Sequence, residues 1–258
     1  MQRSQPMQPL AKLVPAHEVL ALRTRRREEM NCQIVHDSIH RREGWTLIYQ
    51  LELQGEAVGF GTVAIGGPWK DKPTVLEYYV LPEHRLRAFE LFEVFLAAGT
   101  PGFFEIQSND VLPMVMLHTY GRDIVSEKIV FRDGFTTTHP SGGAMMRRVT
   151  SEEDVKNHLE RRQGSSDWIL EMDGQPVGKG GVAFHYNRPY ADVYMEVAEP
   201  FRRRGLGSYL VQELKRVCYD LGAVPGARCN VGNIASRRTL QRAGFVPYAH
   251  ILLGTIPR

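Results

Sequence analysis

Two stretches of this 258-residue chain repeat one pattern. Residues 51–64 (LELQGEAVGFGTVA) align without a gap with residues 170–183 (LEMDGQPVGKGGVA). Each stretch predicts a hairpin with a glycine-containing turn and a further glycine inside the second strand. Farther along each copy, residues 79–90 align in the same way with residues 196–207. The chain is therefore predicted to be a tandem duplication, and it is long enough for two domains that each have a core.

A polar stretch between the two copies predicts where they join. Residues 136–143 (TTTHPSGG) combine threonines with proline and glycines, which is typical of a linker. We therefore expect one domain over residues 1–141 and a second over residues 142–258. Thr150 to Glu153 have the sequence of a capping box, which predicts the first helix of the second domain. Only about one helix fits between this point and the second hairpin.

The second copy contains a glycine-rich basic loop, Arg-Arg-Arg-Gly-Leu-Gly at residues 202–207. It lies between an extended stretch, residues 190–198, and a stretch with helical periodicity, residues 208–221. A strand that turns through glycines into a helix presents free backbone N–H groups and a positive dipole end, which together attract an anion. Arginines just before a helix oppose that dipole unless an anion lies between them. The alternative is a solvated basic turn.

The segments that follow the loop extend the pattern. The helical stretch ends at Gly222, a usual helix stop. A short strand near Arg228 to Val231 comes next, then Asn-Ile-Ala-Ser at residues 233–236, a second helix, and Gly-Phe at residues 244–245. This order resembles the GCN5-related N-acetyltransferase (GNAT) superfamily, whose members transfer an acyl group from acyl-coenzyme A. The resemblance implies an α/β (α+β) fold of two tandem domains, each with a mixed, mostly antiparallel twisted sheet flanked by helices.

The resemblance also implies a coenzyme A site in the second copy. The backbone amides of residues 203–208 would hold the pyrophosphate, and the end of the preceding strand would bind the pantetheine arm as a further strand does. Asn233, which opens the second helix, would contact that arm or hold the cleft, although it also suits a plain helix N-cap. The implied cofactor contacts are Val197, Ala198, Arg202, Arg203, Arg204, Gly205, Leu206, Gly207, Ser208, Asn233 and Ser236.

Two positions that often carry catalysis in that family hold residues that cannot transfer a proton. Leu240 stands where a tyrosine often protonates the departing thiolate. Ala191 stands where some members carry a carboxylate, and Val193 is its neighbour on the same strand face. The acid and the base of a reaction here would have to come from other residues.

Glu196 and Tyr248 are the candidates for the base and the acid. Glu196 has the opposite strand parity from the usual base, as does the nearby Asp192, so either would act through a water molecule or a bulged strand. Tyr248 follows the Gly-Phe pair, and Tyr194 is a further candidate. For all four residues, a satisfied polar group on a half-exposed strand is the alternative interpretation.

The first copy departs from the pattern at the loop. Ala88 and Glu90 occupy the positions of the two glycines, so a carboxylate stands where a pyrophosphate would lie. We therefore expect a degenerate copy that keeps the fold without the cofactor loop. Residues 103–109 predict a strand that leads to a helix begun by Asn109 and ending near Tyr120. A strand pair around Asp133-Gly134 is expected to close this half.

Composition sets bounds on partners. The formal charge of +3 comes from interspersed charges, so no nucleic-acid partner is implied. The three cysteines, Cys32, Cys218 and Cys229, have no metal-binding spacing, so we expect no metal, and they suit a reducing cytoplasm. No apolar run reaches about 18 residues and residues 1–10 are polar, so neither a membrane span nor a signal peptide is expected. The first ten or so residues are expected to be disordered.

The resemblance to the GNAT superfamily implies an acyl-coenzyme A-dependent N-acyltransferase with one active site, in the second copy. The expected donor is acetyl-coenzyme A, and the expected acceptor is an amine of a small molecule or peptide that attacks the thioester directly in a ternary complex. One alternative is a coenzyme A-binding or metabolite-sensing protein without turnover. Another is a transferase with a different acyl donor. The sequence leaves the oligomeric state open.

Overall fold

The computed structural model describes residues 8–30, 37–150 and 165–257, which form two compact units. Unit 1 contains the chain up to Glu127 together with the segment from His250 onward, and unit 2 contains Lys128–Ala249. The strands β6 (Arg122–Asp133) and β12 (Phe245–Thr255) each have residues in both units. The domain boundary predicted between residues 141 and 142 therefore falls inside unit 2.

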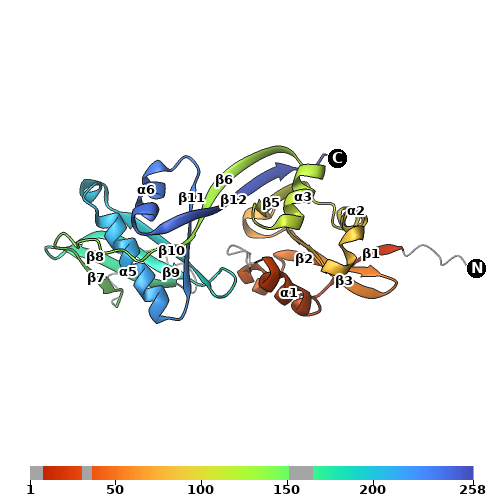
Figure 1. Cartoon of the computed structure of the whole chain (residues 1–258), viewed down its shortest axis with the longest axis horizontal. Helices are drawn as coiled ribbons and strands as arrows, with labels where there is room; N and C mark the ends of the chain where they lie inside the picture. The colour runs from red at the N-terminus through yellow and green to blue at the C-terminus, as the bar shows by residue number, and fades with distance from the viewer. Residues whose placement is uncertain (1–7, 31–36, 151–164, 258) are drawn as a thin grey trace, which may run out of the picture. The chain divides into compact units, whose positions relative to one another are not determined.

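Unit 1 is built on a sheet with the strand order β1, β2, β3, β4, β5 and the end of β12 (Figure 1). Neighbouring strands are antiparallel except for β4 and β5, which are parallel. The strands are β1 (Pro9–Val14), β2 (Thr46–Leu53), β3 (Glu56–Ala64), β4 (Thr74–Val80) and β5 (Phe103–Gln107). The helices are α1 (Leu20–Met30), α2 (Ala88–Gly99) and α3 (Val111–Tyr120), with 3₁₀ turns at Asp37–Arg41, Gly67–Trp69 and Pro82–Arg87.

Helices cover both faces of the unit 1 sheet, because its strands present apolar side chains on both sides. Leu91, Phe92 and Phe95 of α2 join α3 in one buried cluster with β2 to β5. On the other face, Val19 and Leu22 pack with a separate set of strand residues that includes Phe60 and Tyr79. The central strand β4 is consequently buried along its whole length.

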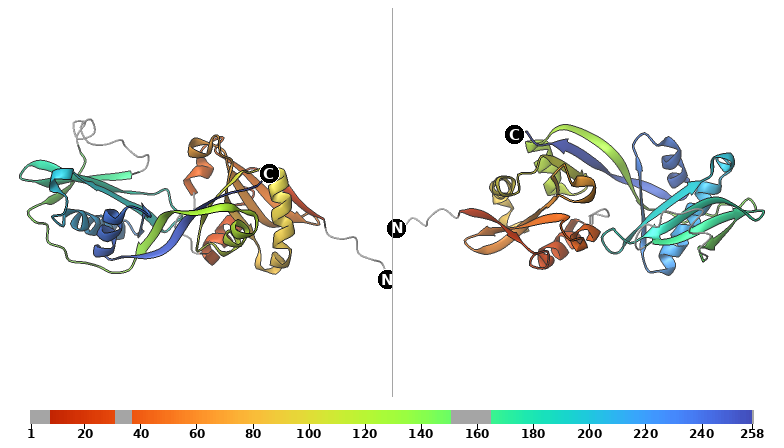
Figure 2. Two further views of the ribbon diagram at one scale, coloured as in Figure 1. Left: turned by 90° about the horizontal axis from the view of Figure 1, so that it is seen from above. Right: turned by 180° about the vertical axis from the view of Figure 1, so that it is seen from behind.

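Unit 2 repeats this plan with the strand order β6, β11, β10, β9, β8 and β7. The only parallel neighbours among these are β10 and β11. The strands are β7 (Met145–Arg148), β8 (Ser165–Met172), β9 (Gln175–Ala183), β10 (Tyr190–Val197) and β11 (Val224–Asn230), and the helices are α5 (Leu206–Asp220) and α6 (Ile234–Arg242). Figure 2 shows α5 lying along the sheet, and its leucines share a single buried cluster with β9, β10 and β11.

The two hairpins predicted from the repeat are confirmed. Gln54-Gly55 and Asp173-Gly174 form their turns, and all four residues have positive φ, as the tight turns of hairpins require. The two hairpins share a register shift at the same aligned position. The strand glycines are also explained: a Cβ at Gly59 would lie 2.2 Å from the Tyr79 carbonyl oxygen of the next strand.

Several local predictions differ from the structure. The strand pair expected around Asp133-Gly134 is wrong, because β6 is one strand whose last residues pair with β11, and Gly134 N–H then bonds to Gly244 O. The end of β12 instead pairs with β5. Helix α3 begins at Val111 with Asp110, not Asn109, at its N-cap. Pro9 and Leu10 already belong to β1. Residues 1–7, Cys32 and residues 151–164, which include most of the predicted capping box of the second domain's first helix, lie outside the described residues.

Candidate active site

The loop between β10 and α5 has the backbone shape of an anion cradle. A short 3₁₀ turn (Glu199–Phe201) follows β10, and then Arg203 and Gly205 adopt left-handed conformations with φ of 64° and 83°. Gly205 is the N-cap of α5 and provides no side chain to cap it. The first N–H groups of the helix therefore have no intrahelical partner, and the helix dipole adds positive potential at the same point.

Two of the three loop arginines already have partners within the protein. Arg202 Nε donates a hydrogen bond of 2.9 Å to the Val197 carbonyl oxygen, which ties the loop to the end of β10. The Arg204 guanidinium lies 5.3 Å from the centre of the Phe201 ring. In unit 1, Arg85 Nε donates the same bond to Val80 O at 3.1 Å. Because the bond occurs in both copies, we assign Arg202 the structural role of holding the loop against the strand. Its predicted contact with a ligand stays a prediction.

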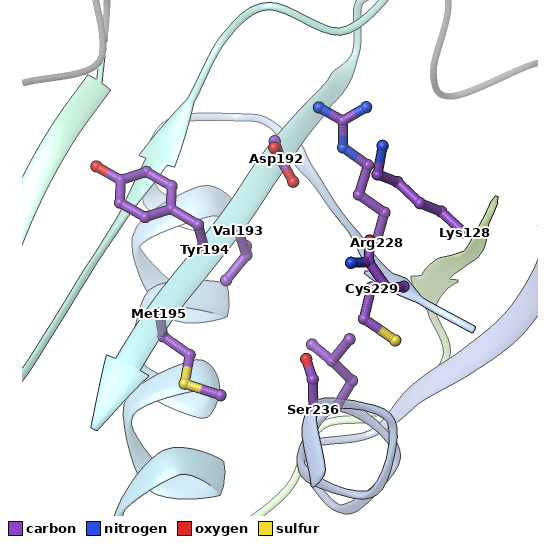
Figure 3. Close-up of a pocket in the computed structure, with 10 residues that line it drawn as sticks. Lys128, Asp192, Val193, Tyr194, Met195, Arg228, Cys229 and Ser236 are labelled. Atoms are coloured by element: carbon purple, nitrogen blue, oxygen red, sulfur yellow. The ribbon is translucent and has the colours of Figure 1, made fainter. Parts of the chain in front are cut away.

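A cleft opens where β10 and β11 separate. The two strands pair at only three positions, the last of which joins Asp192 and Gly226. Beyond it, β10 stays with β9 while β11 turns toward β6. The space between them is a cavity of about 260 Å³, shown in Figure 3. Its lining residues are Lys128, Asp192, Val193, Tyr194, Met195, Arg228, Cys229, Asn230, Ser236 and Leu240.

The free edge of β10 faces this cleft. Ala198 N–H donates to Val177 O of β9 at 2.9 Å, so in an antiparallel ladder the N–H and C=O groups of the alternate residues Val193, Met195 and Val197 point the other way. An extended ligand arm could pair with this edge as another strand would. The contact predicted for Ala198 would then fall to its neighbour Val197.

The cavity has an apolar side and a charged side. Val193, Cys229 and Leu240 belong to the core beneath α5 and α6. Burial raises the pKa of the Cys229 thiol, so this side chain stays neutral. Asp192 and Arg228 are the sequence neighbours of Val193 and Cys229, so their side chains lie on the opposite face of the sheet, at the charged side of the cavity. Figure 3 shows both side chains.

Asn233 and Ser236 act together at the start of α6. Asn233 caps this helix: its side-chain oxygen accepts a 3.0 Å hydrogen bond from the Ser236 N–H. Ser236 also lines the cavity, whereas Asn233 is not among the lining residues in the described part of the chain. The capping role that the sequence offered for Asn233 is therefore present, and a cofactor contact for it stays a prediction.

The two predicted catalytic residues lie outside the cavity lining. The Glu196 side chain is 60% exposed and its carboxylate is 3.6 Å from Lys179 Nζ. Tyr248, on β12, lies beneath the Arg132 guanidinium, which is 4.7 Å from the ring centre. Their catalytic roles stay predictions, and this geometry gives them no support.

Asp192 and Tyr194 line the cavity instead. Asp192 is only 3% exposed, and its Oδ2 lies 3.2 Å from His185 Nε2. The Tyr194 hydroxyl donates a hydrogen bond to Asp167 Oδ1. Sequence reasoning named both residues but ranked them below Glu196 and Tyr248, because only the strand register shows that Asp192 lies where the strands part. The His185 contact had no local sequence signal.

The corresponding place in unit 1 is filled by charged side chains. There, β4 and β5 pair only at Thr74 with Phe103 and at Val75 with Phe104. Arg26 from α1 donates to Glu77 at 3.0 Å and also to Asp110. His40 Nε2 and Thr62 Oγ1 lie 2.7 and 2.8 Å from the second Glu77 oxygen. The cavity beside these residues measures about 10 Å³, about the volume that one water molecule needs.

The loop of unit 1 also differs in backbone shape. A 3₁₀ turn (Pro82–Arg87) runs directly into α2, and none of the described residues 82–90 has positive φ. Glu90 forms a 2.6 Å ion pair with Arg87 at the start of α2. The helix end that would attract an anion is thus already next to a carboxylate of its own chain.

Within residues 8–30, 37–150 and 165–257, no group of three or more His, Cys, Asp or Glu side chains is placed to hold a metal ion. No helix in the same ranges is long and apolar enough to cross a membrane.

Comparison with known proteins gives a family match for part of the chain and a fold for nearly all of it. Residues 135–245 match the model of the acetyltransferase (GNAT) family. No curated protein sequence matches the chain.

Three solved structures align with nearly the whole chain. A GNAT-family acetyltransferase from Colwellia psychrerythraea is 15% identical with a TM-score of 0.73, covering 96% of this chain and 99% of its own. A tandem GNAT protein from the clavulanic acid biosynthesis pathway, solved without AcCoA, is 14% identical with a TM-score of 0.63, covering 96% and 98%. A GCN5-related N-acetyltransferase from Sphaerobacter thermophilus is 17% identical with a TM-score of 0.62, covering 98% of each chain. At these identities the likeness shows the fold, and the predicted architecture of two tandem domains is confirmed.

Proposed function

We propose that unit 2, which contains the residues 135–245 that match the GNAT family model, is an acyl-coenzyme A-dependent N-acyltransferase. Acetyl-coenzyme A is the proposed donor, and an amine is the proposed acceptor. The observation that carries the proposal is the combination of the left-handed loop at Arg203 and Gly205 with the open cleft beside β10. Unit 1 has the same strands but neither feature.

The residues present suit each part of the donor. The amides of residues 203–208 would hold the pyrophosphate, since they surround a helix N-terminus without a side-chain cap. The free edge of β10 would bind the pantetheine arm between Val197 and Met195, and the thioester would lie in the cavity near Val193. Acetyl-coenzyme A would supply a thioester carbonyl, with the coenzyme A thiolate as the leaving group. The cavity of about 260 Å³ favours a short acyl chain.

Asp192 is the proposed group for the acceptor amine. Its carboxylate can hold an ammonium and take up a proton as the amine is released for attack. The nitrogen then bonds to the thioester carbon, the carbon–sulfur bond breaks, and the proton that the nitrogen loses ends on the thiolate or on water. His185, 3.2 Å from Asp192, orients the carboxylate. Tyr194 is the one phenol among the described lining residues, and it is the proposed source of a proton for the thiolate.

One observation favours a coenzyme A-binding protein without turnover. Leu240 lines the cavity at the position where the family often has its tyrosine acid, and the Tyr194 hydroxyl is already bonded to Asp167. The loss of an acid slows such a reaction by about 10²–10⁴-fold without forbidding it. Enzyme activity therefore stays the first proposal, and a cytoplasmic location stays a prediction that accompanies it.

The test is release of free thiol from acetyl-coenzyme A by the full chain, with a panel of primary amines as acceptors. The proposal expects amine-dependent thiol release and an acetylated product detected by mass. Butyryl- and palmitoyl-coenzyme A serve as donor controls and should react more slowly. Binding of acetyl-coenzyme A with no product from any amine would favour the binding protein. A failure to bind acetyl-coenzyme A would contradict both.

A further inference from the structure

Four apolar side chains from three elements form one side of the unit 2 cavity. Val193 and Met195 belong to β10, Cys229 to β11 and Leu240 to α6. Val193, Cys229 and Leu240 are buried members of one core cluster, and Met195 packs against that cluster. Figure 3 shows Val193 and Met195 on the wall that β10 forms and Cys229 on the opposite wall. Because none of the four side chains is charged, they act on a ligand through shape and apolar contact.

The pairing of β10 with β11 closes one end of this cavity. Asp192 and Gly226 form the last of the three paired positions, and the strands separate from Val193 onward. The proposed donor arm runs along the free edge of β10 from Val197 toward Val193, so it ends directly before the paired residues. The acyl group at the end of the arm cannot continue along the strand. It has to turn toward one of the two faces of the sheet.

The two faces offer an acyl group opposite surroundings. Asp192, Tyr194 and Arg228 line the charged side, where the acceptor amine is proposed to bind. An apolar chain placed there would separate these polar groups from water, which costs free energy. Contact with the apolar side removes the chain itself from water, which is favourable. We therefore expect the acyl chain to turn toward Leu240 and the acceptor to approach from the charged side.

Leu240 forms a fixed wall on the apolar side. Its side chain is buried, and the helix that carries it is held on both sides of this residue. Ala243 O accepts a 2.9 Å hydrogen bond from the buried Lys215 Nζ of α5. A Cβ at Gly207 would lie 3.1 Å from Thr239 Cγ2, so α5 and α6 are also in close contact one residue before Leu240. A longer acyl chain therefore cannot displace Leu240 without moving α6 against α5.

Unit 1 shows that the fold does not require open space at this side. The residue aligned with Met195 is Tyr78, which is fully buried. The Tyr78 hydroxyl donates a hydrogen bond to Ala88 O, and the ring centre lies 4.7 Å from that of Phe92. Unit 2 has a half-buried, unbranched methionine at this position. A flexible thioether in place of a packed ring leaves room for a ligand beside Leu240.

We infer that Leu240 limits the length of the acyl group that the donor can carry. This inference rests on the proposed function of the same site. The acyl chain lies on the apolar side between Val193 and Leu240, and a short chain such as acetyl or propionyl ends before it reaches the leucine. Each further methylene group competes with the Leu240 side chain for the same space, which lowers the affinity by about tenfold. Leu240 is thus a specificity-determining residue that takes no part in proton transfer.

The test uses donors that differ only in acyl length: acetyl-, propionyl-, butyryl- and hexanoyl-coenzyme A. Calorimetry measures the Kd of each donor for the full chain without an acceptor, and kcat/KM is measured where transfer occurs. In the unmodified protein, butyryl-coenzyme A should bind at least about tenfold more weakly than acetyl-coenzyme A. In Leu240→Ala this difference should shrink by about tenfold, because the removed side chain leaves space for the longer chain.

Two further variants separate specificity from folding. Leu240→Val removes a single carbon, so it disturbs the core less and should move the butyryl-to-acetyl ratio of Kd in the same direction by a smaller factor. Leu210→Ala is the matched control, because Leu210 is buried in the same cluster and is not among the described residues that line the cavity. It should lower the midpoint of thermal unfolding as Leu240→Ala does and leave the ratio unchanged. The same unfolding measurement shows whether each variant is folded.

Two results would overturn the inference. One is an unchanged butyryl-to-acetyl ratio in the folded Leu240 variants, which would place the acyl group away from Leu240. The other is equal affinity of the unmodified protein for all four donors. Because donor binding is measured without turnover, a protein that selects donors by length and transfers no acyl group would contradict the proposed reaction and support the inference. A protein that binds none of the donors would contradict both.

Discussion

In both units a pair of parallel strands separates after two or three paired residues. The space between the strands is filled by side chains in unit 1 and stays open in unit 2. In unit 1, Glu77 forms hydrogen bonds with Arg26, His40 and Thr62, and the remaining cavity has a volume of about 10 Å³. In unit 2 the position aligned with Glu77 is Tyr194, whose hydroxyl donates to Asp167 on β8, beyond the adjacent strand β9, and a cavity of about 260 Å³ stays open. The same strand arrangement therefore supports either an open cleft or a buried ionic core.

The parts that both units keep are those that set backbone geometry. The hairpin turns and the hydrogen bond from Arg85 or Arg202 to the preceding strand occur in each copy. The loop after that arginine differs, since only unit 2 places residues in the left-handed region there. This difference teaches that the arginine of the loop pattern marks the fold, while the two left-handed residues mark the proposed cofactor site.

The largest expected effect comes from cutting the chain at the predicted seam. A fragment of residues 142–258 lacks the part of β6 that pairs with β11, and it lacks Phe135, whose carbonyl accepts a 2.6 Å hydrogen bond from the buried Lys215. We expect this fragment to be insoluble or to lack a cooperative unfolding transition. A fragment of residues 122–258 restores both contacts and should be clearly more soluble. Equal, native-like unfolding of the two fragments would show that unit 2 does not depend on β6.

The next effect tests the ionic core of unit 1. Arg26→Met leaves the buried Glu77 and Asp110 without their shared partner, and breaking a buried pair in this way costs about 3–5 kcal/mol. Arg25→Met is the matched control, because its side chain is exposed on the same helix. Chemical denaturation of both variants measures the difference in the free energy of unfolding. A loss below about 1 kcal/mol in Arg26→Met would show that the core is not held by these charges.

A smaller effect distinguishes the two carboxylates of β10. Asp192→Asn should lower kcat by about 10²-fold, because the base is lost while the shape of the cavity is kept. Glu196→Gln should change kcat by less than about threefold, since its carboxylate is exposed and outside the cavity. Steady-state kinetics with saturating acetyl-coenzyme A decides between them. The reverse order would restore the sequence-based choice of Glu196.

The smallest effect concerns acid stability. Burial alone raises the pKa of Glu77, but His40 and the arginines outweigh it and hold this pKa well below the ordinary 4.5. A group with a lowered pKa stabilises the fold above its unfolded pKa, so this contribution is lost as the pH falls below 4.5. Asp110 acts in the opposite direction, since burial raises its pKa, which limits the net loss. Thermal unfolding should show a drop of a few degrees in acid that Arg26→Met reduces.

The sequence predicted what local chemistry determines. Tight turns at Gln54-Gly55 and Asp173-Gly174 need positive φ, and the loop at Gly205 needs a residue without a Cβ, so these features are visible in single segments. Helices α3 and α5 also end where the pattern placed them. The family resemblance rested on these same segments.

Features that join distant segments were not predictable in this way. The pairing of β12 with β5 connects residues 251–255, near the C-terminus, with residues 103–107, in the first half of the chain. The ionic core of unit 1 gathers Arg26, His40, Glu77 and Asp110 from four separate elements. Asp192 lines the cleft because it is the last residue of β10 that pairs with β11. The alternation of side chains along one strand does not predict where that pairing ends.

The most direct test of the account is a calorimetric titration of the full chain with acetyl-coenzyme A, repeated on Gly205→Asp and Gly205→Asn. Both side chains tolerate the left-handed backbone better than others and differ by one charge at the helix N-terminus. The account predicts one site per chain, an affinity at least 100-fold weaker in Gly205→Asp, and a smaller loss in Gly205→Asn. Two sites per chain, or equal affinity in the two variants, would contradict it.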